Sequence, residues 1–466
     1  EIDDVAIAAP LTKYSVSISD GTRIEEFVDR AWKIATNGYP GPVHLSLPVD
    51  IMFASFPAKS ELNERPFRAK PKEPSRAWPE PKTLRHILRL IKTSKNPIII
   101  AGHGIWWSKN ETNLGVVGEK LNIPIFNIPY HQKMLNDDCK AYMGLADIHQ
   151  YQPSKFAFHT SDCIIMVGCR LDNQMNFGNP PLIPASAKLI CVNGSNEEID
   201  FNRSADEVLL SDPGAFFDAL IAAEEDQDWA IESDWLQQNI TKRKDWVEQT
   251  LSELSFETSQ KQWKGGVIHP LKLSLEVQSA MKDGDWLVFD GGNTHFWSEI
   301  AVNIMANKGL RLGGIMHPGS FSLLGVGVSF ALSAKNVNPK KTTVLISGDG
   351  AFLSGGLSIE AAFQENLPIV VVIDNNGGLD CISQQQERLF ADGSHFATDF
   401  RDIPFHNLFK GMGGYGELVT HKSQIADAVK RAIASGKPAC INVKAKGVIS
   451  PIVAATSDKR DKASIE

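Results

Sequence analysis

The chain has 466 residues and a formal net charge of −8, from 55 acidic and 47 basic residues. At roughly 150 residues per domain, this length predicts about three domains. No basic block or stripe is present, which argues against a nucleic-acid-binding surface, and an apolar content of 42 % with 22 % charged residues excludes a disordered chain. The longest apolar run, near Leu367–Ile373, is far shorter than the roughly 20 residues of a membrane helix.

The first 56 residues predict only part of a domain. Residues 22–37 place apolar side chains at helical spacing, with Thr22 as the N-cap and Gly38 as the stop signal, and a short strand follows. One helix and one strand cannot bury both of their faces, so residues 1–56 are interpreted as the remnant of an α/β domain that is mostly missing. Residues 57–81 contain six prolines and many charges, which predicts a linker.

Residues 82–223 alternate apolar strands with helical stretches. This alternation predicts a doubly wound parallel sheet with helices on both faces. Residues 224–265, rich in acidic residues, Gln and Trp, predict a polar helix and a connector. Residues 266–446 alternate again and predict a second complete α/β domain, with a long irregular loop after its third strand, and residues 447–466 form a partly basic C-terminal tail.

Two turns carry the strongest chemical signal. Gly348-Asp349-Gly350 ends one apolar strand and Asn375-Asn376 ends the next, with one helix between them. The carboxyl ends of neighbouring strands border a ligand crevice, so the carboxylate of the first turn and the amide of the second are expected side by side. Such oxygen ligands suit Mg²⁺, and the glycines let backbone N–H groups approach a phosphate. Either turn alone would be ordinary turn chemistry, but together they predict a Mg²⁺-bridged diphosphate site.

The GDG sequence, followed after 24 residues by NN, resembles the cofactor signature of thiamine-diphosphate (ThDP) enzymes. Other segments resemble the acetolactate-synthase-like branch of that family, and the resemblance covers essentially the whole chain. Residues 1–56 are similar to the end of its pyrimidine-binding domain, residues 82–223 to its central domain and residues 266–446 to its diphosphate-binding domain. The resemblance implies an enzyme that uses ThDP and Mg²⁺ to make or break C–C bonds next to a carbonyl group.

The resemblance also implies the metal ligands, which would be the side chains of Asp349 and Asn376 and the backbone carbonyl of Gly378. The complete set of implied cofactor-binding positions is Gly292, Asn293, Thr294, Leu324, Gly348, Asp349, Gly350, Ala351, Asn376 and Gly378.

One segment departs from the family pattern, and one residue has an alternative structural role. The loop at Gly292 occupies the place of a diphosphate-binding Gly-Gln-His loop, with Asn293 and Thr294 replacing both side chains. Leu324 stands where a bulky apolar residue supports the bent conformation of the cofactor, although a core leucine is the alternative.

The catalytic residue of the family is a glutamate early in the pyrimidine-binding domain, and no residue of this chain is assigned to it. The chain alone is therefore expected to be an incomplete catalyst. Glu25, Glu26 and Glu360 could be suggested, but their positions favour roles on helix surfaces. Because family sites form between the pyrimidine domain of one subunit and the diphosphate domain of another, the resemblance implies a homodimer or homotetramer.

The central domain raises the question of an adenine cofactor. The segment after the predicted strand at residues 163–168 resembles an arginine-containing loop that binds FAD or ADP in different relatives, with Arg170 for a phosphate and Asp172 or Asn173 for a ribose or amide. Gly102 and Gly104 follow a strand, but the third glycine of a dinucleotide fingerprint is absent. Other relatives have an empty central domain, so both states remain open.

Three functions remain open from the sequence. The default is carboligation or decarboxylation of 2-oxo acids, the alternative is a 2-hydroxyacyl-CoA lyase or an oxalyl-CoA-decarboxylase-like enzyme, and the third is a non-catalytic ThDP-binding fragment or regulatory homologue. The expected partners are a 2-oxo acid or acyl-CoA and further copies of the chain, with no nucleic acid and no membrane. The six cysteines include no Cys-x-x-Cys pair and favour buried, reduced thiols, with the cytoplasm as the default location.

Overall fold

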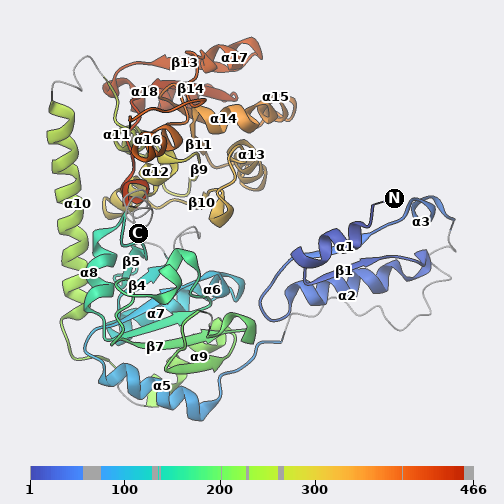
Figure 1. The fold of residues 1–466 in the computed structure, drawn as a ribbon, viewed down its shortest axis with the longest axis vertical. Coiled ribbons are helices and arrows are strands. Elements are labelled where there is room, and N and C mark those ends of the chain that lie inside the picture. Colours follow the sequence, from blue (N-terminus) through green and yellow to red (C-terminus); the bar gives the residue numbers. More distant parts are fainter. Residues whose placement is uncertain are drawn as a thin grey trace.

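The computed structural model describes residues 2–55, 75–128, 135, 138–200, 202–226, 230–260, 267–390 and 392–455. In these ranges the strands form two six-stranded parallel sheets and one two-stranded parallel sheet, with helices packed beside them (Figure 1). The predicted doubly wound α/β class is confirmed. Each helix of the described ranges is too short or too polar to span a membrane.

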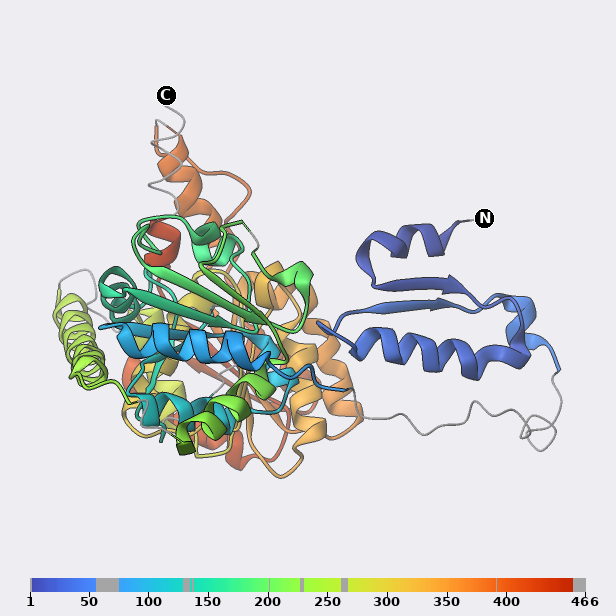
Figure 2. The same cartoon turned by 90° about the horizontal axis from the view of Figure 1, so that it is seen from below.

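The N-terminal segment forms a small unit that stands beside the rest of the molecule (Figures 1 and 2). It comprises α1 (Asp4–Ala8), η1 (Ala9–Leu11), β1 (Tyr14–Ser17), η2 (Gly21–Arg23), α2 (Ile24–Thr36), β2 (Val43–Ser46) and α3 (Val49–Phe53). The predicted helix over residues 22–37 begins differently in the structure, as the turn η2 followed by α2. The Asp20 carboxylate, and not Thr22, is the cap of η2, because it accepts the Thr22 N–H at 2.9 Å. Most of the predicted linker lies outside the described residues.

The first six-stranded sheet has the order β5-β4-β3-β6-β7-β8. Its elements are α5 (Pro81–Thr93), β3 (Pro97–Ala101), α6 (His103–Trp107), α7 (Glu111–Leu121), β4 (Ile125–Asn127), β5 (Tyr142–Leu145), α8 (Gln152–Thr160), β6 (Cys163–Val167), η3 (Asn173–Gly178), β7 (Lys188–Asn193), η4 (Asn196–Glu198), β8 (Glu207–Leu210) and α9 (Pro213–Asp226). The strands β3 and β6 are fully buried, as expected for a sheet covered on both faces.

A long helix, α10 (Trp235–Ser259), follows and runs along one side of the molecule (Figure 1). It packs on α8 and β5 of the first sheet and on α12 (Asn293–Asn307) of the next domain. The buried Trp235 indole donates to the Pro97 carbonyl oxygen at 2.9 Å, which fixes the start of α10 to β3.

The second six-stranded sheet has the order β10-β9-β11-β12-β14-β13. Its other elements are α11 (Pro270–Ser279), β9 (Trp286–Asp290), β10 (Gly314–Met316), η6 (Gly319–Phe321), α13 (Gly327–Val337), β11 (Thr343–Gly348), α14 (Asp349–Gly355), η7 (Gly356–Ile359), α15 (Glu360–Gln364), β12 (Ile369–Asn375), α16 (Asp380–Leu389), α17 (Phe405–Gly411), β13 (Tyr415–Val419), η8 (Lys422–Gln424), α18 (Ile425–Ala434) and β14 (Ala439–Lys444). The prediction of a long irregular loop after β12 is wrong, because this region folds into α16, α17 and β13.

The apolar run of β12 is explained by burial on both faces of the sheet. Val370 and Val372 pack in one hydrophobic cluster with α11 and α18, whereas Val371 and Ile373 pack in a second cluster with α13 and α17. Successive side chains of a strand point to opposite faces, so an uninterrupted apolar sequence fills both layers. Each fully buried Val or Ile contributes about 1.5–3 kcal/mol relative to an exposed one.

The strand order fixes where a ligand crevice opens. The chain passes from β9 outward to the edge strand β10 and then returns to the other side of β9 to form β11. The direction of winding therefore reverses between β9 and β11. In open α/β sheets, ligands bind at the carboxyl ends of the strands at such a point.

Candidate cofactor site

The loop after β9 forms one wall of this crevice. The Asp290 carboxylate accepts the backbone N–H groups of Gly325 and Gly327 at 3.0 and 2.7 Å, which holds the turn before α13 beside β9. Gly291 has a φ of +132°, a conformation that favours glycine, and it lies against the end of β11. Leu324, in the turn before α13, keeps 38 % of its surface exposed.

Asp349 places a buried carboxylate at the end of β11. Its Oδ2 accepts the N–H groups of Gly377 at 2.8 Å and Gly378 at 3.2 Å, and its Oδ1 accepts the N–H of Gly350 at 2.7 Å. Burial raises the pKa of Asp349, and these hydrogen bonds oppose the rise. A side chain at position 350 would bring its Cβ within 2.4 Å of Leu379, so the close approach of the two loops requires glycine there.

The two asparagines at the end of β12 have different roles. Asn375 is buried, and its amide donates to the Asn442 side chain at 2.9 Å, which is a structural contact with β14. Asn376 is half-buried, and its Oδ1 accepts the Gly378 N–H at 3.2 Å. The same N–H donates to Asp349, so one backbone group connects the two side chains that the sequence pairs.

The side chains that replace the diphosphate-binding pair both have protein partners. Thr294 donates to the Asp374 carboxylate at 2.9 Å. The Asn293 amide nitrogen donates to the Gln384 side chain at 2.9 Å, and its oxygen accepts the Ser450 N–H at 2.9 Å. Asn293 thus joins the loop after β9 to α16 and to the C-terminal segment. Because its amide nitrogen carries two N–H groups, the bond to Gln384 leaves one of them for a phosphate.

The other residues that the family resemblance implies for cofactor binding lie at the same strand ends, where the backbone is closely packed. A Cβ at Gly348 would lie 3.2 Å from the Thr294 hydroxyl, and one at Gly292 would lie 2.8 Å from the Cβ of Cys381. Ala351 is buried in the first turn of α14.

Sequence reasoning missed two acidic residues at this edge. Asp374 and Asp380 both have a pKa of about 7, because burial disfavours their charged forms and the nearby Asp349 carboxylate adds to the effect. Asp374 was detectable, since it immediately precedes the asparagine pair on a fully buried strand. Asp380 was not, because the helix that carries it was read as a loop.

The crowding of carboxylates fits a divalent cation. A positive charge beside Asp349, Asp374 and Asp380 would favour their charged forms and offset the cost of burial. In the part of the chain that the structure describes, no three His, Cys, Asp or Glu side chains could hold a metal ion by themselves. A metal at Asp349 would therefore draw on neutral oxygens, such as the Asn376 amide and the Gly378 carbonyl, and on phosphate groups.

The three glutamates considered for the missing catalytic acid lie elsewhere. Glu26 forms a 2.8 Å ion pair with Arg23 on α2, and Glu25, on the same helix, is exposed. Glu360 is exposed at the start of α15.

Comparisons with known proteins match both large domains. Residues 84–220 match the model of the thiamine pyrophosphate enzyme central domain, and residues 290–443 match that of the C-terminal TPP-binding domain. Together these ranges span more than half of the chain. The chain belongs to the thiamine-diphosphate-dependent enzymes.

Full-length relatives place the chain in the acetolactate-synthase-like branch of these enzymes. A probable acetolactate synthase large subunit of Methanococcus aeolicus is 24 % identical, with 94 % of this chain and 72 % of the relative covered. The human 2-hydroxyacyl-CoA lyase 2 is 24 % identical, covering 95 % and 72 %, and an Arabidopsis thaliana 2-hydroxyacyl-CoA lyase is 23 % identical, covering 98 % and 78 %. This chain is accordingly a ThDP-dependent enzyme of the transferase or lyase type.

In the central domain of this ThDP enzyme, the described residues considered for FAD or ADP already have protein partners at the carboxyl edge of the sheet. Arg170 lies 3.6 Å from the Asp172 carboxylate and 3.3 Å from that of Glu198, so two acids already neutralise the guanidinium. Gly102 and Gly104 pack directly on the loop after β6, where a Cβ at Gly102 would come within 2.4 Å of a backbone oxygen. A cavity of about 210 Å³ remains beside this edge. Nothing is described for the side chain of Asn173.

Proposed function

We propose that this chain binds ThDP through Mg²⁺ at the carboxyl ends of β9, β11 and β12 and acts as an acetolactate-synthase-like carboligase of 2-oxo acids. The observation that carries the binding proposal is the Gly378 N–H, which donates to both Asp349 and Asn376 at the point where the sheet winding reverses. It brings together a carboxylate, an amide and a backbone carbonyl of the types that Mg²⁺ selects.

In the proposed reaction, ThDP supplies the reactive groups and the protein binds and orients the cofactor. Bound ThDP supplies a nucleophilic carbon and an electron sink for C–C bond changes next to a carbonyl. In the proposal, Asp349, Asn376 and Gly378 hold the metal, the backbone at Gly292 and Gly348–Ala351 approaches the diphosphate, and Leu324 supports the cofactor from the turn before α13. The glutamate that starts the proton relay in this family has no assigned position in this chain.

The reaction is the finer part of the proposal. The relatives named acetolactate synthase support carboligation of 2-oxo acids, and the equally similar relatives named 2-hydroxyacyl-CoA lyase support cleavage of acyl-CoA substrates as the second candidate. The basic end of the C-terminal tail, which could face a CoA phosphate, lies outside the described residues.

A substrate comparison separates the two reactions. Because no residue of this chain is assigned to the catalytic glutamate, the assay uses the chain together with a complete pyrimidine-binding domain. This protein, supplied with ThDP and Mg²⁺, is offered pyruvate in one assay and a 2-hydroxyacyl-CoA in another. We expect acetolactate from pyruvate. Turnover of the acyl-CoA alone would overturn the carboligase assignment and establish the lyase. If neither substrate reacts while ThDP still binds, the non-catalytic alternative gains support and both reaction assignments fail.

The proposal includes a homodimer or homotetramer with the active site between subunits. Large apolar side chains are exposed around the crevice: Phe321 is 96 % exposed and Leu323 is 63 % exposed in the turn before α13, and Leu357 is 77 % exposed on η7. Exposed apolar patches of this kind favour protein contacts. Light scattering of the protein and of a Phe321→Asp variant tests this, with a smaller assembly expected for the variant and a monomeric wild type as the contradicting result.

Two features of the carboxyl edge of the central sheet argue against bound FAD or ADP. Arg170 is engaged by two carboxylates, and the neighbouring cavity of about 210 Å³ is below the roughly 300 Å³ at which small-molecule sites begin. We therefore propose that this ThDP enzyme works without either nucleotide. Flavin absorbance in the purified protein, or a rise in melting temperature with ADP, would contradict this.

The cytoplasm is the proposed location. All six cysteines are free, and four of them, including Cys163 and Cys440, are buried, as is common for thiols in a reducing compartment. Fractionation of cells that express the tagged protein tests the location.

A further inference from the structure

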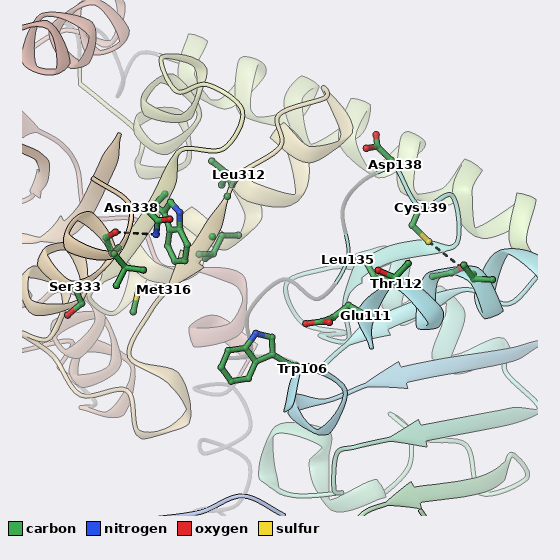
Figure 3. Close-up of a pocket in the computed structure, with 18 of the residues that line it drawn as sticks. Trp106, Glu111, Thr112, Leu135, Asp138, Cys139, Leu312, Met316, Ser333 and Asn338 are labelled. Atoms are coloured by element: carbon green, nitrogen blue, oxygen red, sulfur yellow. Dashed lines mark hydrogen bonds between the residues drawn. The ribbon is translucent and has the colours of Figure 1, made fainter. Parts of the chain in front are cut away.

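A second cavity, of about 710 Å³, lies between the central and C-terminal domains. One wall comes from α6 and α7, with Trp106 and Glu111, and the other from β9, β10 and α13, with Trp286, Met316 and Val337 (Figure 3). Its volume is within the range of small-molecule sites, about 300–1,000 Å³.

This cavity is distinct from the cofactor crevice. Trp286 and Gly314, which line it, are the first residues of β9 and β10 and pair with each other in the sheet. Asp349 and Asn376 instead follow the last residues of β11 and β12. The cavity thus extends from the amino ends of the strands along the edge strand β10, whereas the cofactor crevice lies at the carboxyl ends of the inner strands.

The charged residues described in the lining of the cavity are all acidic. Glu111, Glu119 and Asp138 line it, and none of the described lining residues is Lys, Arg or His. The Asp138 carboxylate is paired with Arg311 at 2.5 Å, and Glu119 accepts the Lys140 N–H at 2.6 Å. The Glu111 carboxylate has no hydrogen bond or ion pair with any described residue. It therefore remains available to a ligand.

Aromatic surface lies beside this free carboxylate. Trp106 is 43 % exposed, and Figure 3 shows its indole and the Glu111 side chain on the same side of the cavity. The opposite wall adds the half-buried indole of Trp286, together with Ile315 and Met316. Indole faces attract cations, and a carboxylate at the edge of an apolar cavity adds charge complementarity.

We propose that this cavity binds a small organic cation with a flat aromatic body, whose positive charge lies near Glu111 and whose ring packs on Trp106. A neutral ligand would leave the Glu111 carboxylate uncompensated, and an anion would be repelled by it. The site does not depend on the proposed cofactor function.

The test uses the full chain loaded with ThDP and Mg²⁺, so that the cofactor crevice is filled. Calorimetric titrations compare N-methylquinolinium with 2-methylquinoline, which has the same ring system and number of carbon atoms but is neutral at pH 8. We expect the cation to bind once per chain and at least about tenfold more tightly than the neutral compound, and quinoline-2-carboxylate to bind more weakly still. Equal affinity of the cation and the neutral compound would overturn the proposal.

Matched variants locate the binding site. Trp106→Ala and Glu111→Gln should each weaken binding of the cation by about fivefold or more. Trp78→Ala and Glu248→Gln, which change exposed residues outside the cavity, should leave it unchanged. An unchanged circular dichroism spectrum and melting temperature show that the variants are folded, and unchanged affinity for the cation in both cavity variants contradicts the assignment. If the cavity variants alter the mass of the assembly instead, the cavity is an interface between copies and the proposal fails.

Discussion

Replacing Asp374 by Asn should make the protein without cofactor less sensitive to alkaline pH. Asp374 is 2 % exposed, and one of its two carboxylate oxygens, Oδ2, accepts a hydrogen bond from Thr294 at 2.9 Å, while Oδ1 has no partner among the described residues. The pKa of this group is about 7 in the folded chain, chiefly because of burial, whereas an aspartate in water has a pKa of 3.8. The Asn side chain keeps the shape and the oxygen that accepts from Thr294 but cannot ionise.

The sign and size of the effect follow from the two pKa values. Because the folded pKa is raised, the stabilising contribution of protonated Asp374 is fully present below the unfolded pKa and is lost as the pH rises through 7. Between pH 5 and pH 8 this loss amounts to about 3 kcal/mol of unfolding free energy. The wild-type protein should therefore lose about 3 kcal/mol more than the Asn variant over this interval.

The assay is urea unfolding from pH 5 to pH 8 without Mg²⁺ or ThDP. Because several domains are present, amide hydrogen exchange of β12 reports the stability of the relevant sheet more directly than a global signal. Asp427→Asn, on the exposed surface of α18, is the control and should behave like the wild type. Equal losses of stability in the wild type and the Asp374 variant would refute the reasoning.

Other substitutions test packing around the site. Gly350→Ala places a Cβ within 2.4 Å of Leu379 and should weaken ThDP binding at least about tenfold while the central domain stays folded, as judged by calorimetry and circular dichroism. Asn293→Ala removes the acceptor of the Ser450 N–H and should increase protease cleavage of the C-terminal segment, whereas unchanged cleavage would show that this bond does not anchor it. Trp235→Phe deletes a buried hydrogen bond and should cost about 1–3 kcal/mol of unfolding free energy in urea, and a cost near zero would contradict the role given to the indole.

The parts of the fold that the sequence predicts are those with a strong apolar pattern. The strand β12 is apolar on both faces and could be placed, and the glycines and asparagines at the ends of β11 and β12 marked the site. The segment Asp380–Leu389 is mostly polar, with Ser383 its one fully buried described residue, so it lacks the apolar stripe that identifies a helix. The edge strand Gly314–Met316 has only three residues and begins with glycine, which leaves too short a pattern to recognise.

Side-chain partners in the site were beyond sequence reasoning for a different reason. Asn293 contacts Gln384 and Ser450, which are 91 and 157 residues away in the chain. The effect of Asp349 on the pKa of Asp380 likewise depends on how α16 folds back onto the strand ends. The spacing of motifs along the chain predicts which residues belong to the site. The partners of their side chains depend on tertiary packing and could not be predicted in this way.

Mg²⁺-dependent binding of ThDP by the wild type and an Asp349→Ala variant tests the central claim most directly. Calorimetric titration of the wild type should show ThDP binding that requires Mg²⁺ and disappears with a chelator. The Asp349→Ala variant should lose this binding, and Asp427→Ala, which changes an exposed carboxylate, should retain it. Unchanged, Mg²⁺-dependent affinity in the Asp349→Ala variant would contradict the proposed site.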